Sequence, residues 1–139
     1  MRYLLDTNIT IFLFSEDYDN ISNDVKNIVE DYHNILYVSS LSLVEIKYLF
    51  EKGKLKKLKF KSTEQIFDFI QNHLGLKIIH TKDEYTKTYA NLSVVEEKTD
   101  LIDRFIISQA ITEKMPLISS DRAFENYTPQ KLKFVYNKR

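Results

Sequence analysis

Short apolar runs alternate along this chain with longer amphipathic stretches, and few folds accommodate that order. The runs are typical of buried strands and cover residues 2–5, 35–38, 76–79, 117–119 and 133–136. The stretches between them have helical spacing and cover residues 9–14, 22–32, 41–52, 63–74, 82–94, 101–114 and 121–127. Strands that alternate with helices usually pair in parallel. We therefore predict an α/β fold in which residues 1–139 form a single domain, with a central parallel β-sheet of about five short strands flanked by helices on both faces.

The composition excludes several classes of protein. The 139 residues include no cysteine, which rules out a disulfide scaffold and a thiolate metal site. The two glycines, Gly53 and Gly75, provide no glycine-rich nucleotide loop. No apolar run approaches the ~20 residues of a membrane span. The N-terminal apolar segment is interrupted by Asp6 and Asn8, whereas a signal peptide has an uninterrupted apolar region. We expect a soluble, cytoplasmic protein without a membrane segment.

The net charge is zero, but the charges are unevenly distributed along the chain. Residues 1–50 hold eight acids and three bases, whereas residues 51–61 hold six lysines and one glutamate. The lysines of this basic segment are Lys52, Lys54, Lys56, Lys57, Lys59 and Lys61. Such a segment, with Phe60 within it, attracts phosphate groups with a strong dependence on salt. It is equally compatible with an ordinary solvated surface of a helix and a turn.

Two aspartates follow predicted strands. Asp6 comes directly after the run 2–5, and Asp121 comes two residues after the run 117–119. Each is a suitable cap for the helix that follows it. The carboxyl ends of parallel strands, however, meet at one edge of a sheet, where sites form near the point at which the strand order reverses. We expect Asp6 and Asp121 to lie close together if their strands are neighbours.

Glu45 lies on a predicted helix in an apolar setting. Its neighbours at helical spacing are Leu41, Tyr48 and Leu49, so its carboxylate projects from an apolar face. Burial of an unpaired carboxylate costs several kcal/mol or more. Glu45 therefore requires a partner, which is either a lysine or arginine from another element or a metal ion.

Asp100 and Asp103 stand at the start of the predicted helix 101–114. Both suit the positive end of a helix, Asp100 as the N-cap and Asp103 in the first turn. Capping accounts for Asp100. It accounts less well for Asp103, which shares its helix face with the apolar residues Ile106 and Ile107 and is expected to point inward at the edge of the sheet.

Several carboxylates at one sheet edge raise one another's pKa unless a cation compensates their charge. The three histidines, His33, His73 and His80, do not have the spacing of zinc ligands. Oxygen ligands without Cys or paired His select Mg²⁺ or Mn²⁺. Such an ion activates water and neutralises charge during in-line displacement at a phosphodiester. The acids therefore indicate metal-dependent phosphodiester hydrolysis.

Four segments resemble PIN-domain ribonucleases of the VapC type, the toxins of toxin–antitoxin pairs. The matching segments are YLLDTNI (3–9), YVSSLSLVEIKYLFEKGKLK (37–56), DLIDRFIISQAI (100–111) and PLISSDRAFENY (116–127). The resemblance implies a Mg²⁺- or Mn²⁺-dependent endoribonuclease. It places the acidic quartet and its accessory residues, which are Asp6, Glu45, Asp103 and Asp121 with Asp100, Thr7, Asn8 and Ser119.

The resemblance also implies roles and partners. Asp6, Asp103 and Asp121 are expected to hold the metal, directly or through its waters, and Glu45 to complete the shell or orient the attacking water. RNA is the expected substrate, and the basic segment its expected contact. A cognate antitoxin and homodimer formation are expected as well; the apolar excess of residues 41–50 and 63–74 also favours a dimer. One departure is Lys98, because many relatives have a histidine there.

Three other interpretations of the same residues are weaker or compete. Haloacid-dehalogenase-like phosphatases need a second acid two residues after the first, where this chain has Asn8. Receiver domains need a phospho-acceptor aspartate after a middle strand and a lysine after a later one, and neither is placed here. The competing alternative is a catalytically silent PIN fold that binds or regulates a partner, with its acids held in structural ion pairs.

Overall fold

The computed structural model describes residues 1–55 and 58–139, and five parallel strands within them form one sheet of order β3-β2-β1-β4-β5. The strands are β1 (Arg2–Leu5), β2 (Ile35–Ser39), β3 (Lys77–Ile79), β4 (Leu117–Ser119) and β5 (Phe134–Tyr136). The α-helices are α1 (Thr7–Phe14), α2 (Asn23–Glu30), α3 (Ser40–Glu51), α4 (Thr63–Asp68), α5 (Asp83–Asn91) and α6 (Leu101–Glu113). Three further helical segments are the 3-10 helices η1 (Tyr18–Asn20) and η3 (Arg122–Gln130) and the π-helical turn η2 (Phe69–His73). The predicted α/β fold is confirmed.

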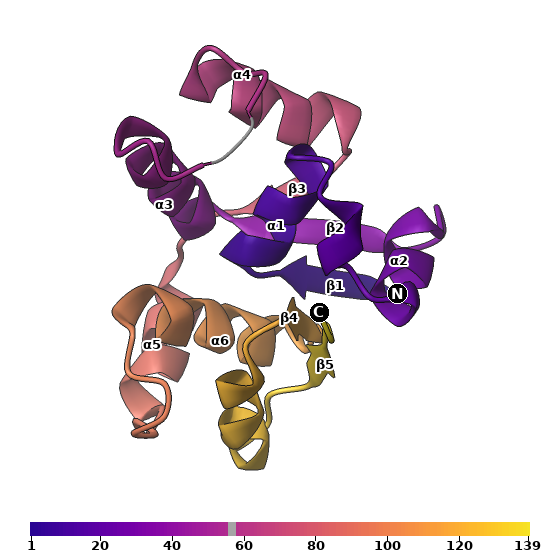
Figure 1. The fold of residues 1–139 in the computed structure, drawn as a ribbon. Helices are drawn as coiled ribbons and strands as arrows, with labels where there is room; N and C mark the ends of the chain where they lie inside the picture. Colours follow the sequence, from indigo (N-terminus) through magenta and orange to yellow (C-terminus); the bar gives the residue numbers. More distant parts are fainter. Residues whose placement is uncertain (56–57) are drawn as a thin grey trace.

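Helices cover both faces of the sheet, as predicted (Figure 1). On one face, Leu5 and Val38 pack in a buried cluster with apolar residues of α1, α2, α3 and α4. On the other face, Leu4 and Leu117 pack with apolar residues of α5, α6 and η3. Consecutive residues of β1 thus serve opposite clusters because side chains alternate across a strand. Both faces are apolar, which explains why the strands appear in the sequence as continuous apolar runs.

The order of the strands reverses between β1 and β4. From β1 the chain proceeds to β2 and β3 on one side, whereas β4 and β5 lie on the other. Leu5 is in register with Ile118, and the Asp6 N–H donates to the Ile118 carbonyl across 3.1 Å. The residues that follow β1 and β4 therefore emerge side by side at the carboxyl edge of the sheet, where α/β proteins usually place their sites.

The helix predicted at residues 82–94 ends earlier than expected. α5 stops at Asn91, and the chain from Leu92 to Asp100 forms a loop. Side chains from η3 fix this loop: the Tyr127 hydroxyl donates to the Lys98 carbonyl across 2.7 Å and accepts from the Val95 N–H, and Gln130 exchanges two hydrogen bonds with the backbone of Ser93. The helical spacing of the sequence continued past Asn91, but these distant contacts decide the path of the chain.

The apolar surface expected on the helices 41–50 and 63–74 is present only in part. Ile66 and Ile70 in the stretch 63–74 are fully buried in the chain's own core, and Phe67 and Phe69 are half-buried against it, so much of the apolar surface expected there is covered by the chain itself. On α3, in contrast, Val44 and Tyr48 remain 62% and 53% exposed. No helix in the described residues is long and apolar enough to cross a membrane.

Candidate active site

Asp6 is a buried carboxylate at the junction of β1 and α1. Its side chain is the N-cap of α1 and accepts a hydrogen bond from the Ile9 N–H at 2.9 Å. The residue is only 4% exposed, and this burial raises its pKa to about 7, although the Ser119 hydroxyl and the Ile9 N–H act in the opposite direction. Asp6 is therefore both the cap of α1 and a buried carboxylate at the carboxyl end of β1.

Asp121 occupies the equivalent position after β4. Its backbone N–H donates to the Ser119 hydroxyl at 3.0 Å, and its carboxylate caps η3 by accepting from the Ala123 N–H at 2.9 Å. Burial raises the pKa of Asp121, but hydrogen bonds from Lys98 and Ala123 outweigh that effect and hold the pKa below its usual range. Ser119 is fully buried and contributes to the environment of both Asp6 and Asp121.

Glu45 comes to the same place from α3. The residue is partly buried, and burial raises its pKa, while a hydrogen bond from Thr7 lowers it and the charge of Asp103 raises it further. The Thr7 hydroxyl also lies within hydrogen-bond distance of the Ser42 hydroxyl, at 3.0 Å, and so links α1 to α3. The fully buried side of α3 is formed by other residues, and Tyr48 is exposed, so the predicted apolar setting of Glu45 is only partly correct. Among the described residues Glu45 has no ion-pair partner.

Asp103 and Asp100 separate into the two roles that the sequence suggested. Asp100 is the exposed N-cap of α6, and its carboxylate accepts from the Asp103 N–H at 2.9 Å. The Asp103 side chain is 21% exposed and lies on the inward side of the helix. Its pKa is raised, mainly by burial and to a smaller extent by the charges of Asp100 and Asp121. The hydrogen bond and the charge of Lys98 oppose this shift. Asp100 therefore acts on the site through its charge and through the helix start.

These side chains line one small cavity of about 80 Å³. Its lining combines residues from five parts of the chain, which are Asp6, Thr7, Asn8, Glu45, Lys98, Asp103, Asp121 and Phe124. The structure thus brings together the whole acidic quartet predicted from the sequence. The histidines lie outside the lining, and all three are exposed.

Lys98 is the member of the site whose position the sequence did not reveal. Its ammonium forms ion pairs with the Asp103 and Asp121 carboxylates at 2.7 and 2.6 Å. These hydrogen bonds outweigh the effect of burial and raise the Lys98 pKa to about 12. The departure from the histidine of many relatives was visible in the sequence, but the contact depends on the loop that η3 fixes. An amino group of the chain itself therefore contacts two of the four carboxylates.

The side chains that line the cavity are of the kind that binds a hard divalent cation. Four carboxylates line the cavity, these side chains offer oxygen ligands, and burial makes the ionised form of Asp6 costly in the absence of a nearby cation. In the described ranges, however, no three acidic or histidine side chains converge closely enough to ligate one ion. Lys98 lies between two of the acids instead.

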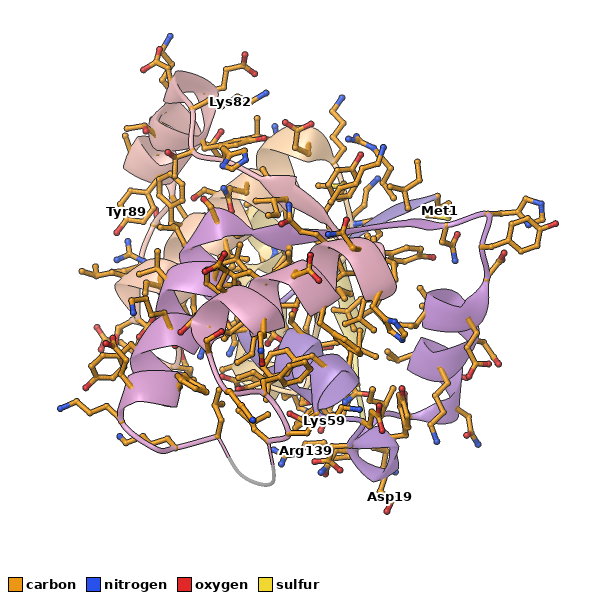
Figure 2. The ribbon with its side chains drawn as sticks, turned by 90° about the horizontal axis from the view of Figure 1, so that it is seen from above. Met1, Asp19, Lys59, Lys82, Tyr89 and Arg139 are labelled. Carbon is orange, nitrogen blue, oxygen red and sulfur yellow. The ribbon has the colours of Figure 1, made fainter. Side chains whose placement is uncertain are left out.

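The basic segment lies away from this cavity. Lys59 pairs with Glu16 at 2.9 Å, just past the end of α1, whereas the acids lie at the start of that helix. Eight residues of α-helix separate the two places by about 12 Å. Lys52, Lys54 and Lys61 are exposed, and Lys56 and Lys57 lie outside the described residues. Figure 2 shows Lys59 in the lower part of the view, near the labels of Arg139 and Asp19, and Lys82 near the top.

Comparison with known protein families shows which family this chain belongs to. The family model described as PIN domain matches residues 3–128, which include all four acids of the site. The chain belongs to the PIN-domain family. The resemblance inferred from the sequence segments is thereby confirmed, and the acids of this PIN domain lie within the matched region.

Individual relatives of this PIN domain agree with the family. Ribonuclease VapC2 from Rickettsia felis is 28% identical over 125 residues, which are 87% of this chain and 87% of that protein. Among solved structures, VapBC2 from Rickettsia felis bound to a promoter DNA fragment has a TM-score of 0.74 and 22% identity, with 99% of this chain and 100% of the other covered. VapBC-1 from nontypeable Haemophilus influenzae has a TM-score of 0.68 and 20% identity, with 98% of both chains covered. These structures share the fold of this PIN domain.

Proposed function

We propose that this PIN domain is a metal-dependent endoribonuclease that acts as the toxin of a toxin–antitoxin pair. The observation that carries the proposal is the convergence of Asp6, Glu45, Asp103 and Asp121 on one cavity from distant parts of the chain. A fold without a use for these charges would keep them apart, because each carboxylate raises the pKa of its neighbours. The similarity to Ribonuclease VapC2 supports RNA as the substrate.

Asp6, Asp103 and Asp121 are the residues proposed to hold Mg²⁺ or Mn²⁺. When bound, such an ion supplies Lewis-acid chemistry that activates water and neutralises charge on the phosphodiester. The protein keeps the oxygens in place: the Ile9 N–H fixes Asp6, and the Ala123 N–H fixes Asp121. Glu45, which has no ion-pair partner in the part of the chain that the structure describes, is proposed to complete the shell or orient the water.

The alternative is a silent PIN fold that binds or regulates a partner. One observation favours it, because Lys98 already pairs with Asp103 and Asp121 as a structural cation would. The two functions differ in their response to metal. Binding of Mn²⁺ to a nuclease site should raise the melting temperature by several degrees through linkage, whereas acids in permanent ion pairs should give no shift.

The proposed partners follow from the toxin role. The structural relatives are VapBC proteins, and we propose a small cognate antitoxin with a flexible segment that covers the acidic cavity. The exposed Val44 and Tyr48 on α3 support a homodimer through this helix. The cytoplasmic location expected from the sequence stays a prediction.

Cleavage of RNA by the antitoxin-free protein tests the proposed function. We expect discrete fragments from total RNA in Mn²⁺ or Mg²⁺ and no cleavage in EDTA, because the ammonium of Lys98 cannot supply the Lewis-acid chemistry of a divalent ion. Fragment sizes would identify the class of RNA. Absence of both cleavage and a Mn²⁺-dependent rise in melting temperature would favour the silent fold.

The basic segment provides a separate prediction about RNA affinity. Neutralisation of Lys52, Lys54 and Lys61 to Gln is expected to weaken RNA binding and to reduce the dependence of log K on log salt by about 0.7 for each phosphate that the variant no longer neutralises. Lys59 is left intact because it pairs with Glu16. Binding is measured by titration of labelled RNA in an Asp103→Asn background, so that the RNA stays whole.

A matched control separates a local effect from general charge. The same change at Lys77, Lys114 and Lys133, which are exposed and form no ion pair in the described residues, removes equal charge from another part of the surface. If both triple variants bind RNA equally at low salt, the basic segment is an ordinary solvated surface. Mn²⁺ binding should be unchanged in either variant, because none of these lysines lines the acidic cavity.

A further inference from the structure

Lys98 holds the oxygens that a metal ion would need. Its ammonium contacts one oxygen of Asp103 at 2.7 Å and one oxygen of Asp121 at 2.6 Å. These two acids are also two of the three proposed metal ligands. A divalent ion bound by the same oxygens would lie close to the ammonium, and like charges at such a distance repel strongly in a partly buried site.

The position of Lys98 is built into the fold. Its carbonyl accepts a hydrogen bond from the Tyr127 hydroxyl at 2.7 Å, and its N–H donates to the Val95 carbonyl at 2.9 Å. Its ammonium also lies 4.9 Å from the centre of the Phe124 ring, a favourable cation–π distance. The Lys98 side chain is only 15% exposed. Lys59 and Lys82 also combine an ion pair with a cation–π contact, but their side chains are 65% and 48% exposed, so Lys98 is distinguished by its burial against two carboxylates.

The charges of the site are only partly compensated by this arrangement. Lys98 provides one positive charge to four carboxylates, and its two short contacts go to Asp103 and Asp121. Asp6 and Glu45 form no ion pair in the described ranges. The site therefore retains an excess of negative charge that attracts a cation of higher charge.

We propose that Lys98 is a tethered counter-ion that holds Asp103 and Asp121 together until a divalent cation binds, whereupon its ammonium withdraws from both carboxylates. Lys98 is thus a positioning residue that sets the metal affinity through competition. Its backbone anchors let the side chain move while the loop stays in place. This inference rests on the proposed function, because it assumes that the acids bind metal.

The first test compares Mn²⁺ affinity in EDTA-treated protein by calorimetry. Lys98→Met removes the competing ammonium and keeps the apolar length of the side chain, so we expect Mn²⁺ to bind at least about tenfold more tightly than to the wild type, equivalent to about 1.4 kcal/mol. Lys87→Met removes the same charge from the exposed surface of α5 and should leave the affinity within about twofold. A merely structural Lys98 would give weaker binding on replacement.

The second test follows the withdrawal directly in the wild type, so it holds even if Lys98→Met fails to fold. An amine-acylating reagent is applied with and without saturating Mn²⁺, and labelling of each lysine is measured by mass spectrometry. Labelling of Lys98 should be low without metal and rise severalfold with it, whereas the exposed Lys114 should react equally in both. Constant labelling of Lys98 with Mn²⁺ bound would overturn the inference.

The outcomes distinguish this inference from the proposed function. If the wild type and Lys98→Met bind Mn²⁺ equally, the metal site stands and the competition is wrong. If neither protein binds Mn²⁺ in calorimetry, the metal site itself is wrong, and the competition falls with it. If only Lys98→Met binds, the competition is supported in its strongest form.

Discussion

Replacement of Asp103 by Asn is expected to reduce RNA cleavage at least about 100-fold. Loss of groups that merely support a metal ligand costs about 10–100-fold in metal affinity or activity, and Asp103 is proposed as a ligand itself. Asn keeps the size of the side chain but removes the charge that faces Lys98 and the cavity. The first turn of α6 should persist, because its cap comes from Asp100. Initial cleavage rates at saturating Mn²⁺ provide the measurement.

A matched variant makes this result specific. Asp83→Asn applies the same change at the exposed first turn of α5, where the carboxylate pairs only with Lys87, and should leave cleavage unchanged. Circular dichroism and urea unfolding of both variants would show that each remains folded. Cleavage by Asp103→Asn within a few-fold of the wild type would remove this residue from the metal site.

The sequence identified the acids because their positions depend on simple features of the chain. Asp6 and Asp121 directly follow apolar runs, and parallel strands place such residues at one edge of the sheet. Asp103 was distinguished from Asp100 by helical periodicity alone. For these residues, local pattern and tertiary position are linked by the geometry of strands and helices.

The position of Lys98 and the packing of α4 could not be predicted from local sequence patterns. Lys98 lies in a loop, so no periodicity specifies the direction of its side chain, and its place depends on Tyr127, which is 29 residues away. Residues 63–74 are rich in apolar side chains whether these face the core or a partner, and only the packing of Ile66 and Ile70 in the core shows that the chain itself covers much of them. Contacts between distant segments decide both cases.

Burial of the Asp6 carboxylate has a cost in stability that can be measured. Replacement of Asp6 by Asn is expected to make the metal-free protein more stable at pH 8 by on the order of 2–4 kcal/mol. The Asp6 pKa is about 7 in the folded protein, mainly because of burial, against 3.8 as its ordinary value. Asn carries no charge, and its side-chain oxygen can still accept the Ile9 N–H that caps α1.

The pH dependence identifies the cause of this gain. Because the folded pKa of Asp6 is raised, its protonated form stabilises the fold below pH 4, and this contribution is lost as the pH rises from about 4 to about 7. The stability advantage of Asp6→Asn should therefore be small near pH 4, grow across that window and level off near pH 8. Urea unfolding in EDTA at a series of pH values measures it, and the difference between the two proteins cancels groups that titrate in both.

Addition of Mn²⁺ should reverse the order of stability. The wild type gains stability from a cation that binds its folded state, by RT ln(1 + [Mn²⁺]/Kd), whereas Asp6→Asn loses a proposed ligand and most of that gain. The variant should thus be the more stable protein without metal and the one that responds less to it. Parallel stability curves for both proteins from pH 4 to pH 8 would mean that Asp6 ionises in the fold without cost.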